Sequence, residues 1–319
     1  MAIILTGGIG FVGSNMVRKL NEHDIKDIII IDTYGNDEKM ANLHGLDFLD
    51  IFDYKDGIPA VKQYLEGIED PKAFFHIGAN SNVMDYDVKG MMNQNYEFSK
   101  MYCEYAASRN IPFIYASSSA IYGNSKEFSI NEANSLPHNT YAYSKWLFDK
   151  YVMAHLPRYN NCVVGYRFFN VFGWNEFYKD ETACLPYRFY SFIRDKGFID
   201  LFRDHIERDY VWVDDLAEVL YQTMLKKDFD SGIYNLGGNH PVSTRKVAEI
   251  VIESFMEKGL LEGTIVEKYI QLIDMPEILR GKFQFYTHAE EQLEFISNIT
   301  KGNEQKIRNY VRLLIENKV

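Results

Sequence analysis

The sequence predicts an α/β protein built on a doubly wound parallel sheet, with a smaller α/β lobe toward the C-terminus. Two observations predict this fold. In the first half of the chain, short runs of β-branched and aromatic residues alternate with longer segments of helical pattern, which is typical of helices that connect parallel strands. The short runs are apolar almost throughout, as expected of strands that helices cover on both faces.

The elements of the first half can be placed from these runs. Strands are expected at residues 2–6, 27–32, 73–77, 112–118 and 161–168. Helices are expected at residues 12–20, 91–107 and 141–155. After about residue 170 the alternation gives way to irregular segments rich in aromatic and charged residues. We therefore expect a larger domain over residues 1–170, to which some later segments return, and a smaller lobe over residues 171–319.

Composition and charge narrow the class of protein. Of the 319 residues, 46% are hydrophobic and 25% are charged, which is ordinary for a chain with a sizeable core. The formal net charge of −11 disfavours nonspecific binding of nucleic acid, which depends on basic surface. No stretch approaches the roughly 18 apolar residues of a membrane helix, and the N-terminus lacks the basic start of a signal peptide.

The cysteines and histidines point to no metal site. Cys103, Cys162 and Cys184 are widely spaced, which fits neither a disulfide framework nor a zinc site. Free thiols are typical of a reducing cytoplasm, so a cytoplasmic protein is expected. His76 falls in the middle of an expected strand and is interpreted as a packed core residue.

A glycine-rich turn joins the first expected strand to the first expected helix. Gly7, Gly10 and Gly13 form a G-x-x-G-x-x-G pattern, in which small residues let the backbone approach a pyrophosphate. The helix expected at residues 12–20 would present its free N–H groups and positive dipole to the phosphates, and Phe11 just before it is also expected to bind the dinucleotide. Asp32 ends the second expected strand about 20 residues further on. Turn and acid together favour dinucleotide binding over a plain tight turn, and make residues 1–170 the dinucleotide-binding domain.

The residues after the second strand leave the choice of dinucleotide open. Asp32 would accept hydrogen bonds from an adenosine ribose, and by itself it favours NAD. Thr33 and Lys39 follow closely, and both could contact the 2′-phosphate of NADP.

Tyr141 and Lys145 are four residues apart on an expected helix, so their side chains share one face. A free phenol has a pKa of about 10. A neighbouring ammonium and an oxidised nicotinamide would stabilise the phenolate and make it a usable base. Tyr143 points elsewhere and is interpreted as packing or as a contact to the smaller lobe. Ser118 or Ser119, at the carboxyl end of an expected strand, could share a substrate alcohol with Tyr141.

The glycine turn, the strand-end serine and the Y-x-x-x-K motif, in this order, resemble the extended short-chain dehydrogenase/reductase superfamily, whose fold is Rossmann-like. The superfamily pattern favours Ser118 over Ser119 as the catalytic hydroxyl, because Ser118 stands four residues before the tyrosine of "YG". The stretches "YSKWLFDKYV", "MMNQNYEFSK" and "RGKFQFYT" are most similar to the ADP-L-glycero-D-manno-heptose 6-epimerases. This resemblance runs nearly end to end and implies that residues 171–319 mainly bind substrate.

The resemblance implies a reaction and its residues. In these epimerases, NADP removes a hydride from C6 of ADP-D-glycero-D-manno-heptose to give a ketone, and the hydride returns to the opposite face. Tyr141 would be one acid/base, and Lys179 falls where the family has a second acid/base lysine. Lys145 would hold the nicotinamide ribose. The expected cofactor is therefore NADP, with NAD as the alternative, and it should stay bound through each turnover.

Further residues are assigned by the same resemblance. Arg208 matches the position that contacts the nucleotide diphosphate, and Ser81 and Asn170 are expected to contact substrate. Trp174-Asn175 stands where the family usually has Pro-Arg, and we expect this change to lie close to the sugar. Asn95 is interpreted either as a tie between an active-site helix and the neighbouring strand or as a helix-surface residue. The resemblance also implies a homo-oligomer, a pentamer, and a role in making a precursor of lipopolysaccharide.

The sequence disfavours one alternative and leaves two others open. A 4,6-dehydratase would have an Asp-Glu pair after the strand-end hydroxyl, where this chain has Ser119 and Ala120. A UDP- or GDP-sugar 4-epimerase or dehydrogenase would need only Tyr141, Lys145 and Ser118, and would leave the second lysine unexplained. An inactive cofactor-binding module would be expected to have lost at least one of these residues.

Overall fold

The computed structural model describes residues 2–82, 87–277 and 284–317, and within them the main sheet has seven parallel strands. In spatial order these strands are β3 (Asp50–Asp53), β2 (Ile28–Asp32), β1 (Ile3–Thr6), β4 (Ala73–His76), β5 (Phe113–Ser118), β6 (Val163–Phe168) and β10 (Gly232–Leu236). The chain order reverses between β1 and β4, and a crevice for ligands opens at the carboxyl ends of strands at such a point.

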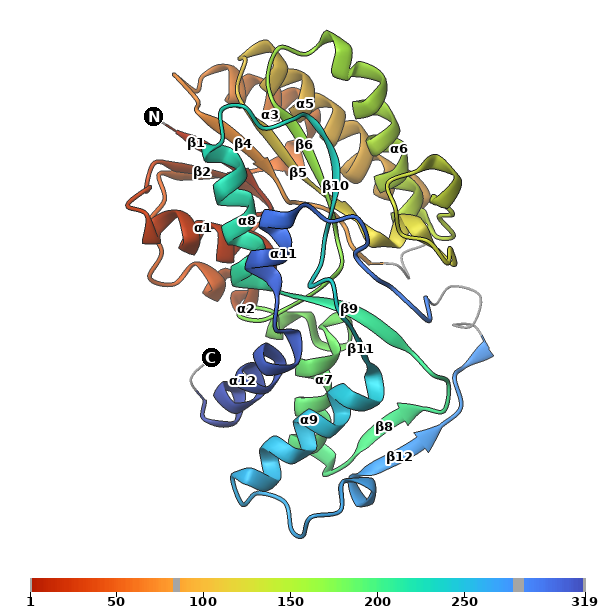
Figure 1. The fold of residues 1–319 in the computed structure, drawn as a ribbon. Helices are drawn as coiled ribbons and strands as arrows, with labels where there is room; N and C mark the ends of the chain where they lie inside the picture. Colours follow the sequence, from red (N-terminus) through yellow and green to blue (C-terminus); the bar gives the residue numbers. More distant parts are fainter. Residues whose placement is uncertain (1, 83–86, 278–283, 318–319) are drawn as a thin grey trace.

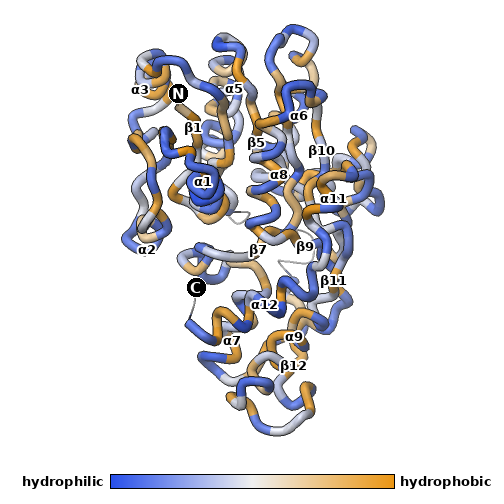
Figure 2. Tube along the Cα trace, turned by 60° about the vertical axis from the view of Figure 1, so that its left-hand side comes forward, coloured by the Kyte–Doolittle hydropathy of each residue, from blue (hydrophilic) through white to orange (hydrophobic). Residues whose placement is uncertain are grey.

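Helices cover both faces of this sheet (Figure 1). One face packs against α1 (Phe11–Glu22), α8 (Val213–Leu225) and α11 (Glu294–Thr300), and the other against α3 (Gly57–Glu66), α5 (Phe98–Ser108) and α6 (Thr140–His155). Alternate residues of a strand serve opposite faces, so that Ile3 and Leu5 pack with the first set of helices and Ile4 with the second. Figure 2 shows hydrophobic positions along the strands and hydrophilic ones on the outer side of helices such as α1.

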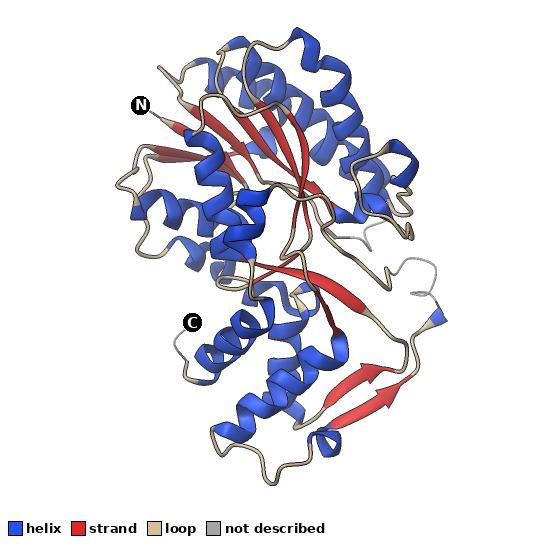
Figure 3. Cartoon of the chain, in the orientation of Figure 1, coloured by secondary structure: helices blue, strands red, loops and turns tan. Residues whose placement is uncertain are grey.

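A smaller lobe lies beyond the carboxyl ends of the strands (Figure 3). It contains one sheet of β7 (Asn170–Phe172), β9 (Glu207–Trp212) and β11 (Pro241–Ser243), and a second of β8 (Ile199–Phe202) and β12 (Ile270–Ile273). Its helices are α7 (Leu185–Lys196), α9 (Thr244–Glu257) and α12 (Asn303–Ile315). These three helices share one apolar core with the strands of the lobe.

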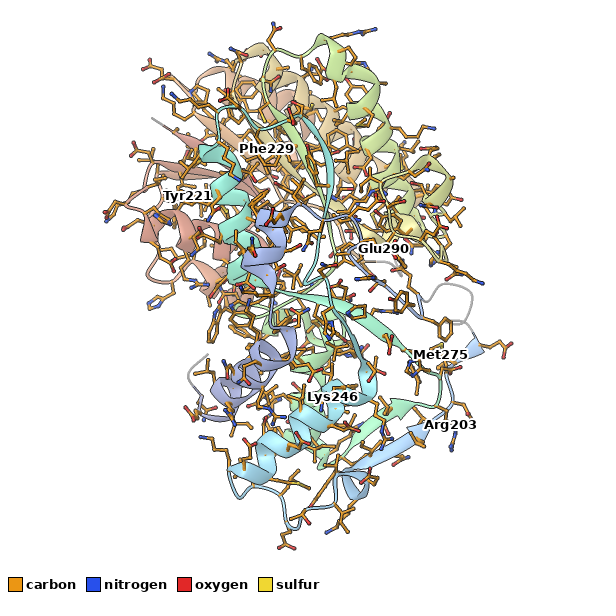
Figure 4. All side chains as sticks on the ribbon, viewed as in Figure 1. Arg203, Tyr221, Phe229, Lys246, Met275 and Glu290 are labelled. Atoms are coloured by element: carbon orange, nitrogen blue, oxygen red, sulfur yellow. The ribbon has the colours of Figure 1, made fainter. Side chains whose placement is uncertain are left out.

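The chain passes several times between the main sheet with its covering helices and the smaller lobe. Residues of α8, β10 and α11 belong to the main sheet and the helices that cover it, although they follow residue 170. Figure 4 labels Tyr221 and Phe229 in this part of the molecule and Lys246 in the smaller lobe. Asp209, which is buried on β9, accepts hydrogen bonds from the backbone N–H groups of Gly238 (2.7 Å) and Ala289 (2.8 Å), so one carboxylate joins two of the returning segments. A division of the chain at residue 170 stays a proposal.

The predicted doubly wound α/β fold is confirmed, and the differences are local. The sequence reasoning did not place β3, because its residues are half polar and this edge strand is partly exposed. The helix expected at residues 91–107 begins earlier, with α4 (Val88–Met92), and a π-helical turn at Asn93–Glu97 separates α4 from α5. A short helix, α2 (Asp37–Met40), follows β2.

Candidate active site

A cavity of about 1200 Å³ lies at the carboxyl ends of the strands, between the main sheet and the smaller lobe. Pockets for a single small ligand are typically about 300–1,000 Å³, so this one has room for two. All the site residues predicted from the sequence line it. They are Gly7, Gly10, Phe11, Gly13, Asp32, Thr33, Lys39, Ser81, Ser118, Tyr141, Lys145, Asn170, Lys179 and Arg208.

The glycine turn connects β1 to α1 at the wall of this cavity. Gly7 has φ +73°, and a Cβ there would come within 2.5 Å of the Cα of Gly78, which follows β4. A Cβ on Gly13 would lie 2.0 Å from the carbonyl oxygen of Gly7. Larger residues at either position would therefore push α1 or β4 away from the turn. Gly10, the residue that caps α1, makes no side-chain hydrogen bond to the first N–H groups of the helix.

Asp32 fastens the same turn to β2. Its side chain is buried; Oδ2 accepts from the N–H of Ile9 (2.9 Å), and Oδ1 accepts from the N–H of Thr33 (2.7 Å). Lys39 Nζ lies 2.8 Å from Oδ1 and also donates to the carbonyl of Thr33 (3.2 Å). An anion and a cation therefore stand together at the end of β2, where a ribose hydroxyl or a ribose phosphate could be bound.

Tyr141 and Lys145 lie on α6 and reach the cavity beside Ser118, the last residue of β5. The Tyr141 hydroxyl is hydrogen-bonded to Ser118. Lys145 is 3% exposed, and its ammonium donates to the carbonyl of Ala116 (2.7 Å). Tyr143 is 46% exposed, packs edge-on against Trp146 and is not among the described residues that line the cavity.

Burial affects the protonation of both Tyr141 and Lys145. Burial raises the pKa of the Tyr141 phenol, and the hydrogen bond from Ser118 only partly opposes this. Burial lowers the pKa of Lys145 to about 8, against the attraction of Asp149. The expected lowering of the phenol pKa by Lys145 and an oxidised nicotinamide stays a prediction. Burial therefore favours the neutral form of both side chains.

Asn95 ties α6 to the segment after β4, as one of the two interpretations expected. The buried Asn95 side chain accepts from the N–H of Asn80 (2.8 Å) and donates to the Asn80 carbonyl (2.8 Å) and to Ser144 Oγ (3.1 Å). Ser81, exposed at the cavity rim, follows directly. His76 is a core residue, as predicted: it is buried between the hydroxyls of Thr6 and Ser99, each 2.7 Å from a ring nitrogen.

Lys179 enters the cavity from the segment Gly173–Cys184, which contains a 3-10 turn at Phe177–Thr182. Its ammonium lies 5.5 Å from the centre of the Phe11 ring, close to the glycine turn. Glu176, which is fully buried, holds both ends of the segment: it accepts from the N–H groups of Gly173 (3.1 Å) and Cys184 (2.7 Å). The hydroxyl of Tyr310 on α12 donates to the same carboxylate (3.1 Å).

The structure contradicts the expected position of Trp174-Asn175. Neither residue is among the described residues that line the cavity. Asn15 Nδ2 on α1 donates to the Trp174 carbonyl (2.9 Å), and Asn175 Nδ2 donates to Ser14 Oγ (2.9 Å). The pair fastens the segment Gly173–Cys184 to α1.

The far end of the cavity contains two arginines. Arg208, buried on β9, has its pKa lowered to about 10 by burial. Arg188 on α7 also lines the cavity, and burial lowers its pKa. Asn170 opens β7 on the same wall. Arg188, Glu176 and Tyr178 were not predicted from the sequence. The one local signal was Glu176 itself, a charged residue between aromatic residues in "WNEFY".

Two stretches compared with the heptose epimerases fall partly outside the described residues: the first differs in detail from their usual substrate-side loop, although it keeps Ser81, and the second resembles them. These are "ANSNVMDYD", which includes residues 83–86, and "RGKFQFYT", which includes residues 280–283. Gln284, the first described residue of the second stretch, lines the cavity and donates to the carbonyls of Ser119 (3.1 Å) and Gly123 (3.0 Å).

The described residues contain neither a membrane-spanning helix nor a metal-binding cluster. No helix there combines the length and the apolar character that crossing a membrane requires. No group of three or more His, Cys, Asp or Glu side chains there is placed to hold a metal ion.

The buried Glu176 predicts a specific pH dependence. Burial raises its pKa from 4.5 to about 7, so the fold prefers the protonated acid, and this preference is lost as pH rises from 4.5 through about 7. The rise corresponds to ~3 kcal/mol of unfolding free energy. Urea unfolding of wild type and Glu176→Gln across this range should show a smaller loss of stability with pH in the variant. Parallel curves for the two proteins would contradict the assignment.

A parallel sheet with a glycine turn at its switch point, and a Tyr/Lys/Ser set at the end of β5, defines a dinucleotide-binding enzyme fold of the Rossmann type. The model of the NAD dependent epimerase/dehydratase family matches residues 3–237 of this chain, well over half of its length. The chain belongs to the NAD dependent epimerase/dehydratase family.

Solved structures of similar shape include several sugar-nucleotide enzymes. The ADP-L-glycero-D-manno-heptose-6-epimerase of Helicobacter pylori is 26% identical, with a TM-score of 0.79 over 97% of this chain and 94% of that one. The UDP-N-acetylglucosamine 4-epimerase of Methanobrevibacter ruminantium is 22% identical, with a TM-score of 0.80 over 99% and 98%. The UDP-glucose 4-epimerase of Thermus thermophilus, in complex with NAD, is 22% identical, with a TM-score of 0.73 over 98% and 98%. The last two support the fold alone.

Proposed function

We propose that this protein inverts C6 of ADP-D-glycero-D-manno-heptose, giving ADP-L-glycero-D-manno-heptose through a transient ketone, with a tightly bound NADP. The observation that carries the proposal is that Tyr141 and Lys179 reach one cavity from two separate segments, α6 and Gly173–Cys184. Two acid/base groups suit a reaction in which the sugar presents opposite faces in turn. The 26% identity to the Helicobacter pylori epimerase supports the choice of heptose.

Each residue has a role in this reaction. The dinucleotide, when bound, supplies the hydride acceptor and returns the same hydride. Tyr141 Oη, as the phenolate that the charge of an oxidised nicotinamide would stabilise, would take the proton of the substrate hydroxyl in one orientation. In the other orientation the Lys179 ammonium would give a proton to the ketone oxygen as the hydride returns. Ser118, already hydrogen-bonded to Tyr141, holds that hydroxyl in reach of the phenol. No net oxidation occurs, because the proton and the hydride both return to the sugar.

The ligands are assigned to the two ends of the cavity. Gly7, Gly10, Phe11 and Gly13 would bind the dinucleotide phosphates at the start of α1, and Lys145 would donate to the nicotinamide ribose. Arg208 would neutralise the diphosphate of the sugar nucleotide, since buried arginines bind such groups in a bidentate way. Ser81 and Asn170 would contact the sugar between them.

NADP is proposed over NAD because Lys39 is the cation at the end of β2, with Thr33 beside it. Lys39→Ala is expected to weaken NADP binding about tenfold, since a charge-assisted hydrogen bond contributes about 1.5–3 kcal/mol. NAD affinity should stay level or rise, because Asp32 would lose its partner and could accept from the ribose. Calorimetric titration of both dinucleotides checks this, with Lys72→Ala, at an exposed ion pair, as the control. Equal NADP affinity in wild type and the Lys39 variant would favour NAD as the cofactor.

The resemblance also supports a cytoplasmic homo-oligomer, a pentamer, that makes a lipopolysaccharide precursor. Sedimentation equilibrium of the purified protein would establish the number of subunits. A monomer would overturn this part of the proposal without affecting the chemistry at Tyr141.

Proton NMR of the purified protein incubated with ADP-D-glycero-β-D-manno-heptose tests the reaction directly. Appearance of the C6-inverted sugar without added dinucleotide would establish the activity and show that the dinucleotide co-purifies. No change after addition of NADP and NAD would overturn the proposal. Conversion of a UDP- or GDP-sugar in the same assay would then identify the alternative, a 4-epimerase or dehydrogenase that needs only Tyr141, Lys145 and Ser118. Failure with every sugar would leave the cofactor-binding module.

A further inference from the structure

The hydroxyl of Tyr178 lies at the N-terminus of α1. The backbone N–H of Phe11, the first residue of this helix, donates to Tyr178 Oη over 3.0 Å. A Cβ on Gly10 would lie 3.5 Å from the same oxygen. Tyr178 stands 167 residues away in the chain, so the segment Gly173–Cys184 brings a phenol to the end of the helix where the dinucleotide phosphates are proposed to bind.

The phenol is arranged to donate a second hydrogen bond. Because Oη accepts from Phe11, its own proton remains for another acceptor, and within residues 2–82, 87–277 and 284–317 this hydroxyl donates no hydrogen bond. Tyr178, Gly10, Val12 and Gly13 line the cavity together. The helix end is a favourable place for an anion, because the first N–H groups of a helix have no partner within it.

The segment that carries Tyr178 is fixed before any ligand arrives. Asn175 donates to Ser14 and Asn15 donates to Trp174, both over 2.9 Å. Glu176 anchors the segment from the other side, at Gly173 and Cys184. A side chain already held in place loses little conformational freedom when it binds, which favours affinity.

We propose that Tyr178 fastens the diphosphate of the bound dinucleotide, through the chain Phe11 N–H to Tyr178 O–H to a phosphate oxygen. This inference rests on the proposed function and deepens it. A hydroxyl that accepts one hydrogen bond donates the next more strongly, and donation to a charged oxygen is stronger still. The contact retains the reduced dinucleotide between the two hydride transfers and, since Lys179 is the next residue, sets the position of that lysine.

Tyr178→Phe removes only the hydroxyl and is the decisive variant. Protein stripped of dinucleotide should bind NADP and NAD about tenfold more weakly, the effect of one lost charge-assisted hydrogen bond. During turnover, free reduced dinucleotide should appear in the medium, which wild type should not release. Tyr143→Phe, which removes an exposed hydroxyl on α6, is the matched control and should match wild type in both measurements.

Two outcomes overturn the inference. Unchanged affinity would show that Tyr178 does not touch the diphosphate, and tighter binding would show that it competes with the phosphate for Phe11. Phosphorus NMR of the bound dinucleotide gives a second measurement that does not depend on stability, because one of the two phosphates should change its shift in the variant. If wild type binds the dinucleotide but converts no sugar, the proposed function fails and this binding test still decides the role of Tyr178.

Discussion

Tyr141→Phe is expected to reduce kcat by roughly a thousandfold, within the usual range for loss of a general acid/base. The substrate hydroxyl could then no longer pass its proton to a phenol oxygen as the hydride leaves C6. Phenylalanine keeps the ring on α6, and Lys145 keeps its own hydrogen bond to Ala116. Dinucleotide binding should therefore be nearly unchanged. Rates measured by NMR with saturating substrate would separate kcat from KM.

The pH profile gives this prediction a second readout. Since burial raises the Tyr141 pKa and so favours the neutral phenol, the rate of the step that needs a base should rise as the solution becomes alkaline. Tyr143→Phe should keep the wild-type rate and profile, because Tyr143 is exposed and packs on Trp146. Turnover of Tyr141→Phe at the wild-type rate would show that the assigned mechanism is wrong.

The fold could be predicted because its signals are local. Strands such as β1, β2 and β5 are buried on both faces, so they appear in the sequence as short, continuous apolar runs. The two strands of the main sheet that were not predicted from the sequence, β3 and β10, lack such a local signal. β3 is a half-polar edge strand. β10 is a short strand that pairs with β6, and no local pattern in the sequence predicts this pairing.

The candidate site likewise contains residues that the sequence predicts and contacts that it does not predict. Glycine spacing and the four-residue spacing of Tyr141 and Lys145 are fixed by turn and helix geometry, so the sequence alone places them. Burial raises the pKa of Tyr141, and spacing in the sequence does not predict this effect because burial is a property of the assembled structure. Glu176 and Tyr178 act on Tyr310 and Phe11 across more than 130 residues of chain, and sequence spacing contains no trace of such contacts.

Lys179→Met should separate the two halves of the reaction. Methionine keeps most of the side-chain length but cannot carry a proton, so complete epimerisation should fall by roughly a thousandfold. One half-reaction, the reduction of the dinucleotide by one of the two epimers, should still take place. With the C6 epimer whose hydroxyl faces Tyr141, the bound dinucleotide should still be reduced in a single turnover, and with the other epimer it should not.

This asymmetry distinguishes a second acid/base from a lysine that only binds the diphosphate. Loss of a binding charge would raise KM for both epimers and leave single-turnover reduction intact with each at saturation. Lys150→Met is the control, since Lys150 pairs with Glu132 at an exposed site. If Lys179→Met epimerises at the wild-type rate, one tyrosine suffices for both faces, and the 4-epimerase alternative becomes the better account of this site.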